Sequence, residues 1–533
     1  MANRRKWILT AAGLGALVVI VILTIPIALT PGLRAKLTAA LEERFDADVE
    51  LESLRVSMLP RLRVAGTGVV LRHRGRTDVP PLIAIPSFSA EATLWGLLGE
   101  PLRLSRVHLE GLEINIPPGG MSIDDKEKPD DEPVKKTDPK APPPPDPPQT
   151  DATAGKSPLI VEDLLSERAV LNILRREPDK APRIFEIAHL SMQHVGANDP
   201  WPFRAELTNP TPPGRIAVQG TFGPWNAGEP SHTPLAAKYE FRDADLGVFK
   251  GIRGILQSDG AFDGVLERIE VDGTADVPEF ALDAAGQPIH LATKFSAVVD
   301  GTNGNTWLRP VNATLGESPI LANGGVVEKD GEDGRTITLD IVMSDARIED
   351  VLRLAVKGAE PPMTGALELK TSFLLPPGDR DAIEKLHLNG SFTVASGRFA
   401  KGSVQAKMNE LSQKARGEGN SGDPAEQVVS NFNGRFVMKN GAIHFSSLTF
   451  GVPGAKVNLA GTYALRSEAL DFRGTVRLDA KLSELTTGVK SFLLKAIDPL
   501  VRRKDVTVIP ITVRGTAQKP DFGLDMKRAF TPK

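Results

Sequence analysis

Side chains that could perform catalysis are scattered along this sequence and form no known catalytic pattern. Of the eight His residues, His189 and His194 are the only pair close together, and they are not part of an H-E-x-x-H motif. No G-x-S-x-G elbow, no G-x-x-x-x-G-K-[ST] loop and no S-x-x-K motif occurs. The chain has no Cys, which excludes disulfides, thiolate metal sites and a Cys nucleophile. The sequence therefore predicts no catalytic residue, no metal site and no cofactor, and hence a protein that is not an enzyme.

The charges of the chain also fail to predict a site. The net charge is −3 and the pI is about 6.3, so no basic excess favours binding to nucleic acid. The clearest acidic clusters, at residues 124–125 and 130–132, lie in a Pro-rich and charged segment at 118–158. That segment has almost nothing to bury, so we expect a disordered loop, either a spacer or a partner-binding polyproline II segment.

The N-terminus has the pattern of a membrane anchor. The uncharged run WILTAAGLGALVVIVILTIPIALT, residues 7–30, follows Arg4, Arg5 and Lys6. As a helix it would be about 36 Å long, enough to cross a bilayer. A cleaved signal peptide is the alternative, but the run is longer than the usual apolar region and no A-x-A site follows. Because flanking positive charge stays in the cytoplasm, residues 1–30 are predicted to form a cytoplasmic tip and a single transmembrane helix.

The rest of the chain has the periodicity of β-strands. The stretch LAGTYALRSEALDFRGTVRLDAKL, residues 459–482, places Phe472 and Val476 on one side and Arg473 and Arg477 on the other. Such alternation indicates strands with one apolar face and one solvated face. The same period predicts strands at Val49–Val56, Leu62–Leu71, Ala90–Leu94 and Val107–Ile116, and through most of the chain after Leu159.

Only a few segments have helical spacing. The apolar residues predict short helices at Leu33–Phe45, Leu164–Val170, Ile348–Val356, Val404–Lys414 and Leu482–Val501. The last of these either docks on the sheet or touches a membrane surface. A weak pattern, Asp-Ala-x-[Leu/Ile]-x-x-apolar, recurs at Asp243, Asp345 and Asp479, and we expect each Asp to cap a short helix that follows a strand.

So few helices cannot cover the apolar face of such a long sheet, although that face must be buried against something. The sheet could fold onto itself as a sandwich or barrel with a dry core. It could instead form an open trough whose apolar lining meets an apolar ligand, because exposed apolar patches of that size are rare. Periodicity alone does not choose between the two.

Several segments, in their order along the chain, resemble the AsmA family. Near the N-terminus these are the helix before FDADVELE, then SMLPRLRV with Pro60, PPLI, and the strand ending LEGLEINI. Near the C-terminus they are MTGALELKTSFLLPPG (363–378), LNGSFTVASGRFAKGSVQAKMNELSQKARGEG (388–419), the 459–482 stretch, and VIPITVRGTAQKPDFGLDM (508–526). The resemblance covers most of the chain outside the Pro-rich segment.

The resemblance implies a protein of the bacterial inner membrane, with its N-terminus cytoplasmic and its bulk periplasmic. It implies a mainly β fold, in which a single transmembrane helix is followed by a long curled antiparallel β-groove, related to chorein-like bridge lipid-transfer proteins. The expected divisions are 1–30 anchor, 31–117 N-terminal helix and β region, 118–158 loop, 159–480 groove body, 481–503 amphipathic helix and 504–533 C-terminal strands. Stacked at about 4.8 Å per strand, about 20–25 strands would extend about 100–120 Å.

The function implied is binding or transfer of phospholipid, or of another acyl-chain ligand, in support of the outer membrane. The partners would be the lipid, the inner membrane and an outer-membrane or other envelope protein. The alternative is a scaffold or assembly factor that pairs with outer-membrane proteins by β-augmentation. The residues expected to line the groove are Ile337, Leu339, Ile341, Leu367, Leu369, Phe436, Leu459, Tyr463, Leu470, Phe472, Val476, Leu478, Ile509, Ile511 and Val513.

Overall fold

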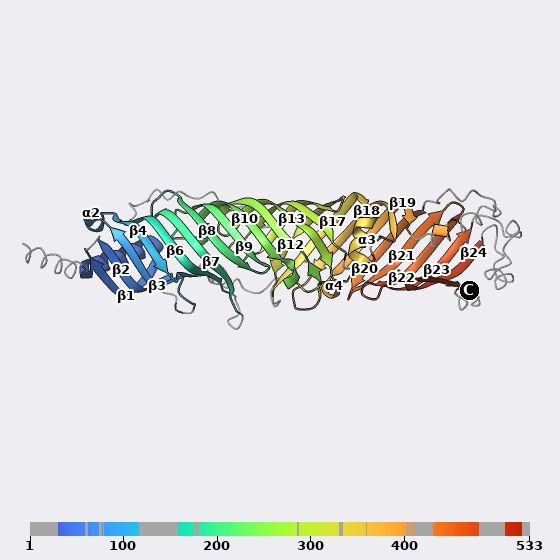
Figure 1. The fold of residues 1–533 in the computed structure, drawn as a ribbon, viewed down its shortest axis with the longest axis horizontal. Helices are drawn as coiled ribbons and strands as arrows, with labels where there is room; N and C mark the ends of the chain where they lie inside the picture. The colour runs from blue at the N-terminus through green and yellow to red at the C-terminus, as the bar shows by residue number, and fades with distance from the viewer. Residues whose placement is uncertain are drawn as a thin grey trace, which may run out of the picture. The chain divides into compact units, whose positions relative to one another are not determined.

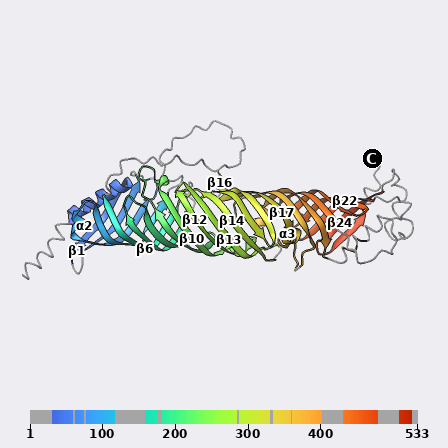
Figure 2. The same ribbon diagram turned by 90° about the horizontal axis from the view of Figure 1, so that it is seen from above.

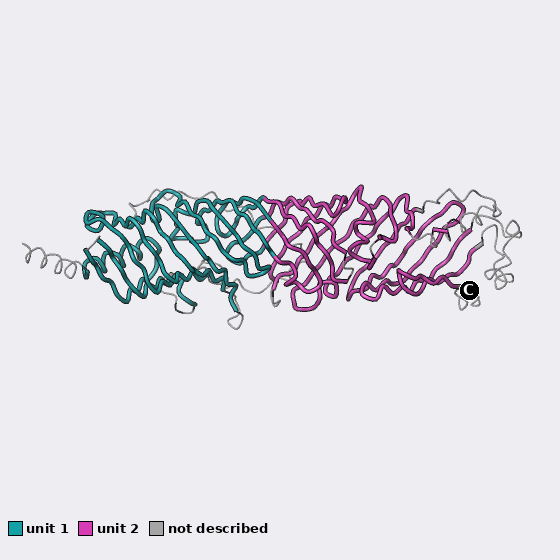
Figure 3. The backbone as a smooth tube through the Cα atoms, in the orientation of Figure 1, with its two compact units in different colours: residues 1–244, 258–272, 298–305 teal, residues 245–257, 273–297, 306–533 magenta. Residues whose placement is uncertain are grey.

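The structure is a computed structural model in which the chain forms two compact units. Unit 1 comprises Met1–Ala244, Ser258–Asp272 and Val298–Asn305, and unit 2 comprises Asp245–Gln257, Gly273–Ala297 and Thr306–Lys533 (Figure 3). The residues that the structure describes are 30–58, 62–73, 77, 79–116, 158–174, 181–284, 287–329, 334–358, 360–400, 405–406, 409, 430–478 and 507–524.

The described residues are mainly β, and their 25 strands belong to one sheet (Figure 1). Unit 1 holds, wholly or mainly, β1 (Ala47–Ser57), β2 (Arg63–His73), β3 (Ile83–Ala92), β4 (Leu102–Glu110), β5 (Glu113–Ile116), β6 (Leu159–Ile173), β7 (Arg183–Val195), β8 (Trp201–Pro210), β9 (Pro213–Phe222) and β10 (Pro234–Asp245). Residues of both units occur in β12 (Ile255–Val265), β13 (Arg268–Leu282) and β14 (Ile289–Val299). Unit 2 holds β11 (Ile252–Arg253), β15 (Thr306–Leu315), β16 (Ser318–Glu328), β17 (Arg335–Arg347), β18 (Met363–Leu375), β19 (His387–Phe399), β20 (Ser430–Lys439), β21 (Ala442–Val452), β22 (Ala455–Ala464), β23 (Ala469–Leu478), β24 (Thr507–Thr516) and β25 (Pro520–Leu524).

The helices are few and short. They are a helix at residues 30–45, α2 (Leu94–Leu98), α3 (Ile348–Ala355) and α4 (Ala382–Lys385), with 3-10 turns η1 (Pro230–His232) and η2 (Leu246–Val248). Residues 405–406 and 409, the described part of the helix predicted at Val404–Lys414, are helical as well. None of the helices within the described ranges is long and apolar enough to cross a membrane. The predicted anchor at 7–30, the loop at 118–158 and the helix at 482–501 lie outside the described residues, apart from residues 30 and 158 at their ends.

Most strands pair with their neighbours in sequence, in antiparallel register. This meander runs from β6 to β10 in unit 1 and from β15 to β25 in unit 2. β6 is the exception, because its other edge pairs in parallel with β4 and β5. The helix predicted at Leu164–Val170 is therefore wrong. With sheet partners on both edges, the backbone of this segment finds its hydrogen bonds as a strand, and tertiary pairing overrides the local apolar spacing.

The Asp-Ala pattern marks the ends of strands, but its Asp residues do not cap helices. Asp243 and Asp345 adopt φ values of 56° and 54°, in the left-handed region that Asp tolerates better than most residues. At Asp345 the pairing of β17 with β18 shifts register, and α3 then begins after Arg347 without a side-chain cap. In the first copy it is Asp245, not Asp243, that accepts a hydrogen bond from Gly247 N at 2.8 Å. The prediction that Asp243 and Asp345 cap helices is wrong, because Asp345 lies at a bulge of β17 and Asp243 lies within β10, two residues before the capping Asp245.

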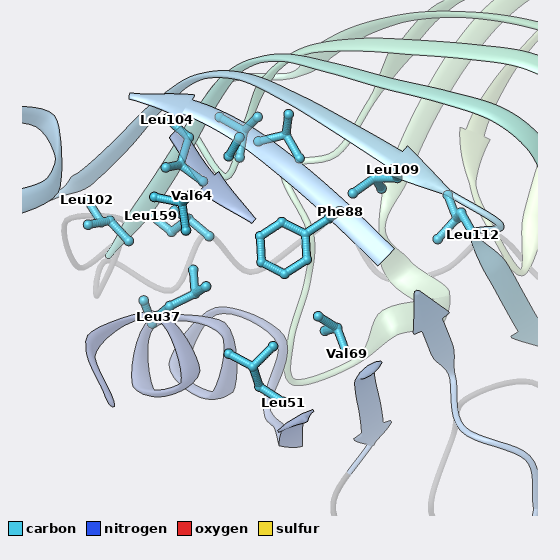
Figure 4. Close-up of a cluster of buried hydrophobic side chains, with 14 of the residues drawn as sticks. Leu37, Leu51, Val64, Val69, Phe88, Leu102, Leu104, Leu109, Leu112 and Leu159 are labelled. Carbon is cyan, nitrogen blue, oxygen red and sulfur yellow. The ribbon is translucent and has the colours of Figure 1, made fainter. Parts of the chain in front are cut away.

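The helix at 30–45 packs into the core of unit 1, as the apolar spacing predicted. Leu33, Leu37 and Ala40 belong to one buried cluster with residues of β1–β8, and Figure 4 shows Leu37 facing Leu102 and Leu159. The C-terminal end of this helix adjoins the start of β1, yet it contacts residues that follow β7 and β9. The Arg44 guanidinium donates to Ala197 O at 3.5 Å, and the ring of Phe45 lies 5.8 Å from that of Trp225. The sheet of unit 1 therefore curls around the helix, and we call the face turned toward the helix the inner face of unit 1. In unit 2 the inner face is the one that carries the buried side chains of Tyr463, Phe472 and Val513.

Glycines on the inner face allow aromatic rings to lie against the neighbouring strand. Gly434 of β20 stands opposite Phe392 of β19. A Cβ atom at Gly434 would lie 2.3 Å from Phe392 Cε1, whereas no real Cβ contact is so short. Phe392 cannot easily move aside, because its ring already packs 6.2 Å from that of Phe436 and 6.3 Å from that of Phe445. Gly66 and Phe88 repeat the arrangement in unit 1.

We expect Gly434→Ala to lower the free energy of unfolding by about 1–3 kcal/mol, because the methyl group displaces a packed ring. Thermal unfolding of the purified protein measures the effect as a lower Tm. Gly228→Ala is the matched control, since its added Cβ would lie 3.6 Å from the nearest atom, an ordinary contact. An unchanged Tm for Gly434→Ala would contradict the close approach of Phe392.

Candidate functional site

The inner face of unit 2 carries the predicted lining residues. Directly opposite residues of an antiparallel pair share a face, and the register links Leu369 to Phe392, Phe445 to Gly461 and Phe472 to Val513. Following these directly opposite pairs from β17 to β24 shows that all of the predicted lining residues lie on the same face of the sheet. Those that are buried are Leu367, Phe436, Leu459, Tyr463, Phe472, Val476, Leu478 and Val513. Those that are half-buried are Ile337, Leu339, Ile341, Leu369, Leu470, Ile509 and Ile511.

The opposite face of the same strands is solvated. Asp471, Arg473 and Arg477 alternate with Phe472 and Val476 and are exposed. The period of two read from the 459–482 stretch is thus confirmed as the burial pattern of β22 and β23.

Helix α3 runs across the inner face of unit 2, from one end of the strands toward the other. It begins where β17 ends, and Ile348 packs in a cluster with Leu367, Val394 and Phe432. Successive strands alternate in direction. The turn between β22 and β23 therefore lies at the opposite end of the strands from the point where β17 ends. Val356, which follows α3, is nevertheless in the same cluster as Tyr463 and residues near this turn.

Hydrogen bonds fix the C-terminal end of α3 to this turn. Tyr463 Oη donates to Ala355 O at 3.0 Å, and burial raises the pKa of this phenol. Lys357 N donates to the buried Glu468 Oε1 at 2.7 Å, while Lys357 Nζ donates to Arg466 O at 2.8 Å. Polar groups that are buried and paired in this way are costly to separate.

α4 covers the neighbouring part of the same face. Ile383 has 2% of its surface exposed and belongs to the cluster that contains Tyr463 and Phe472. The Arg466 guanidinium donates to Asp381 Oδ2 at 2.6 Å, which holds α4 to the β22–β23 turn. Residues from α4 and from the end of α3 therefore share one buried core with Tyr463, Phe472 and Val513, while Leu470, Ile509 and Ile511 of the same strands stay half-buried.

Apolar residues on the inner face of unit 1, on β9, β10 and β12, were missed by the sequence analysis. The register pairs Val218 of β9 with Tyr239 of β10, and Ile216 with Phe241. All four side chains are half-buried, although they face the same side as the buried core residues Trp201 and Ala205. Their neighbours on the other face, Arg215, Gln219, Lys238 and Glu240, are exposed. The alternation in GRIAVQGTF and LAAKYEF was the signal that could have revealed this part.

The polar atom of Tyr239 is paired, so the ring presents an apolar surface. Its Oη lies 3.1 Å from Ser258 Oγ, and its ring stacks on that of Phe262 of β12 with centroids 6.4 Å apart. Burial raises the pKa of Tyr239, so the phenol stays neutral over the physiological range. Phe262 is half-buried as well, which extends this apolar surface to β12. We call Ile216, Val218, Tyr239, Phe241 and Phe262 the open apolar face.

The described residues contain no group of three or more His, Asp or Glu that could hold a metal ion. The His pairs with carboxylates are single and partly exposed: His194 Nδ1 lies 3.0 Å from Glu162 Oε2, and His232 Nε2 lies 2.8 Å from Glu267 Oε1. Exposed pairs of this kind contribute little to stability.

Comparisons with known proteins give no relative. No family model matches the chain, and neither the curated proteins nor the solved structures contain a match. The resemblance to the AsmA family therefore remains a prediction from the sequence.

Substituting a charge for Phe472 distinguishes a covered core from an open lining. Phe472 is 6% exposed inside the cluster with Tyr463 and Val513. We expect Phe472→Asp to lower the free energy of unfolding by several kcal/mol, since a buried carboxylate would lack a partner. Arg473→Asp, one position along on the solvated face, should change it by less than about 0.5 kcal/mol. Denaturant unfolding measures both, and a normally stable Phe472→Asp protein would show that α3 does not seal this part.

Proposed function

We propose that this chain is a membrane-anchored groove protein that binds the acyl chains of phospholipid on the open apolar face of unit 1. The observation that supports the proposal is the half-buried state of this face. Its residues alternate in the same way as a protein core. Among the described residues, Val218 packs beside the cluster that contains the helix at 30–45, whereas Ile216, Tyr239, Phe241 and Phe262 belong to none of the buried clusters. Apolar surface of this kind gains about 25 cal/mol for each Å² that a ligand removes from water.

An acyl chain suits this surface better than a compact ligand. The apolar side chains come from three strands, β9, β10 and β12, and are continuous from strand to strand through the pairs Val218–Tyr239 and Ile216–Phe241. The single polar atom among them, Tyr239 Oη, is already paired with Ser258. A ligand with polar groups along its length would leave them unpaired here, at a cost that an alkyl chain avoids.

The proposal also includes the anchor and the compartment. The uncharged stretch at 7–30 would hold the chain in the inner membrane, with unit 1 and unit 2 in the periplasm. The resemblance to the AsmA family supports the same assignment. In this role the protein would contribute to phospholipid transport toward the outer membrane.

Photocrosslinking at adjacent residues tests the lipid-binding face. Val218 lies on the open apolar face and Gln219 is exposed on the other side of the same strand. With p-benzoylphenylalanine at each position in turn, irradiated cells should yield a phospholipid adduct for residue 218 and none for 219. Mass spectrometry of the purified protein identifies the adduct.

Other results would overturn the proposal. Equal lipid adducts at both positions would indicate nonspecific membrane contact. A protein adduct at 218 in place of lipid would favour the scaffold for outer-membrane proteins. Circular dichroism of each variant shows that the sheet is intact before the adducts are compared.

Retention of the N-terminus tests the anchor. If residues 7–30 remain in the mature protein, N-terminal sequencing of the membrane fraction should begin at residue 1 or 2, and alkaline carbonate should not extract the protein. A mature N-terminus near residue 31 would show that the stretch is a cleaved signal peptide.

A further inference from the structure

α2 carries an exposed apolar cluster on the surface of unit 1. Trp95 has 83% of its surface exposed, Leu98 has 50% and Leu94 has 43%. These three residues lie within one helix of five residues, so their side chains form one patch. An exposed tryptophan flanked by two leucines costs free energy in water and indicates a contact that the isolated chain does not make.

The rest of α2 is capped and packed against unit 1. The exposed side chains of Trp95, Leu94 and Leu98 therefore belong to a fixed helix. Thr93 caps the helix by accepting a hydrogen bond from Gly96 N at 3.0 Å. Leu97 is 5% exposed and packs in the main cluster of unit 1. Gly96 lies so close to β4 that a Cβ atom would come 2.6 Å from Arg103 O. The helix thus rests on β4 by its inner side and presents Trp95 on its outer side.

α2 lies at the end of unit 1 where the described chain begins. Leu97 shares its buried cluster with Leu33 and Leu37, which belong to the first turns of the helix at 30–45. Both views place α2 and β1 at this same end of unit 1 (Figures 1 and 2). The uncharged stretch of residues 7–30 leads directly into this helix.

We infer that the outer side of α2 inserts into the interfacial region of the bilayer that holds residues 7–30. Tryptophan is enriched at this depth because its ring is apolar and its N–H can still bond to the wet headgroup region. Leu94 and Leu98 would enter the upper part of the acyl chains on either side of it. The inference rests on the proposed function, specifically on the anchor, and adds a second contact that fixes the orientation of unit 1 on the membrane.

Quenching by brominated lipid tests this contact in the full-length protein. The protein carries Trp7→Phe, so that the tryptophan of the anchor stretch does not contribute, and is reconstituted into vesicles of phosphatidylcholine brominated at carbons 6 and 7. Bromine quenches tryptophan only at close range. We expect a quenched component of the fluorescence that is lost when Trp95→Phe is added. Trp307→Phe is the control, because Trp307 Nε1 is buried, and this change should leave the quenched component intact.

Flotation of the same vesicles separates failure of this inference from failure of the proposed function. If the protein does not float with the vesicles, the anchor and the inference both fail. If it floats but Trp95→Phe leaves quenching unchanged, α2 does not touch the bilayer and the inference is wrong, while the anchored groove stands. Trp95 is largely exposed, so the Phe variant should fold normally, and circular dichroism checks this.

Discussion

An antiparallel sheet whose side chains alternate must bury one of its faces, and this requirement determines how the chain is organised. In each unit, helices among the described residues satisfy part of it. In unit 1 the helix at 30–45 packs inside the curl, with Phe45 against Trp225. In unit 2 α3 crosses from the end of β17 to the turn after β22. A helix of eight or sixteen residues can cover only a few strands, since it extends about 12–24 Å and neighbouring strands lie about 4.8 Å apart. Within the described ranges, Ile216, Tyr239, Phe241 and Phe262 of β9, β10 and β12 belong to no buried cluster, and they stay half-buried.

The faces of the strands could be predicted from the sequence because the period of two is a local property. Phe472 and Arg473 point to opposite sides whatever covers the sheet. The helix at 348–356 was also predictable, because its apolar spacing and its packing agree. Leu164–Val170 was not, since partners distant in sequence on both edges make it a strand. The role of Asp345 depends on a φ angle that the pattern of residue types does not specify.

The sequence did not predict which parts of the apolar face of the sheet are covered by helices. Tyr463 and Tyr239 both occupy apolar positions of alternating strands, and both have a raised pKa through burial. Tyr463 nevertheless donates its hydrogen bond to the backbone of α3, whereas Tyr239 pairs with Ser258 of a neighbouring strand. Tyr463 is therefore part of a buried core, whereas Tyr239 belongs to a half-buried face of the sheet. This difference arises from a contact between residues 108 positions apart, which no local pattern encodes.

The attachment of α3 sets the free-energy cost of uncovering part of the inner face of unit 2. Uncovering Tyr463 and Phe472 requires the C-terminal end of α3 to leave the β22–β23 turn, which breaks the bonds from Tyr463 to Ala355 and from Lys357 to Glu468. Buried hydrogen bonds contribute about 1 kcal/mol each, and burial of a Val or Ile side chain adds about 1.5–3 kcal/mol. With Val356 also exposed, the uncovered state lies several kcal/mol above the covered one. At about 1.4 kcal/mol for each factor of ten, fewer than about one molecule in a hundred has this part of the face accessible at any moment. A ligand that occupied the buried positions near Tyr463 and Phe472 would therefore have to bind tightly enough to offset this cost.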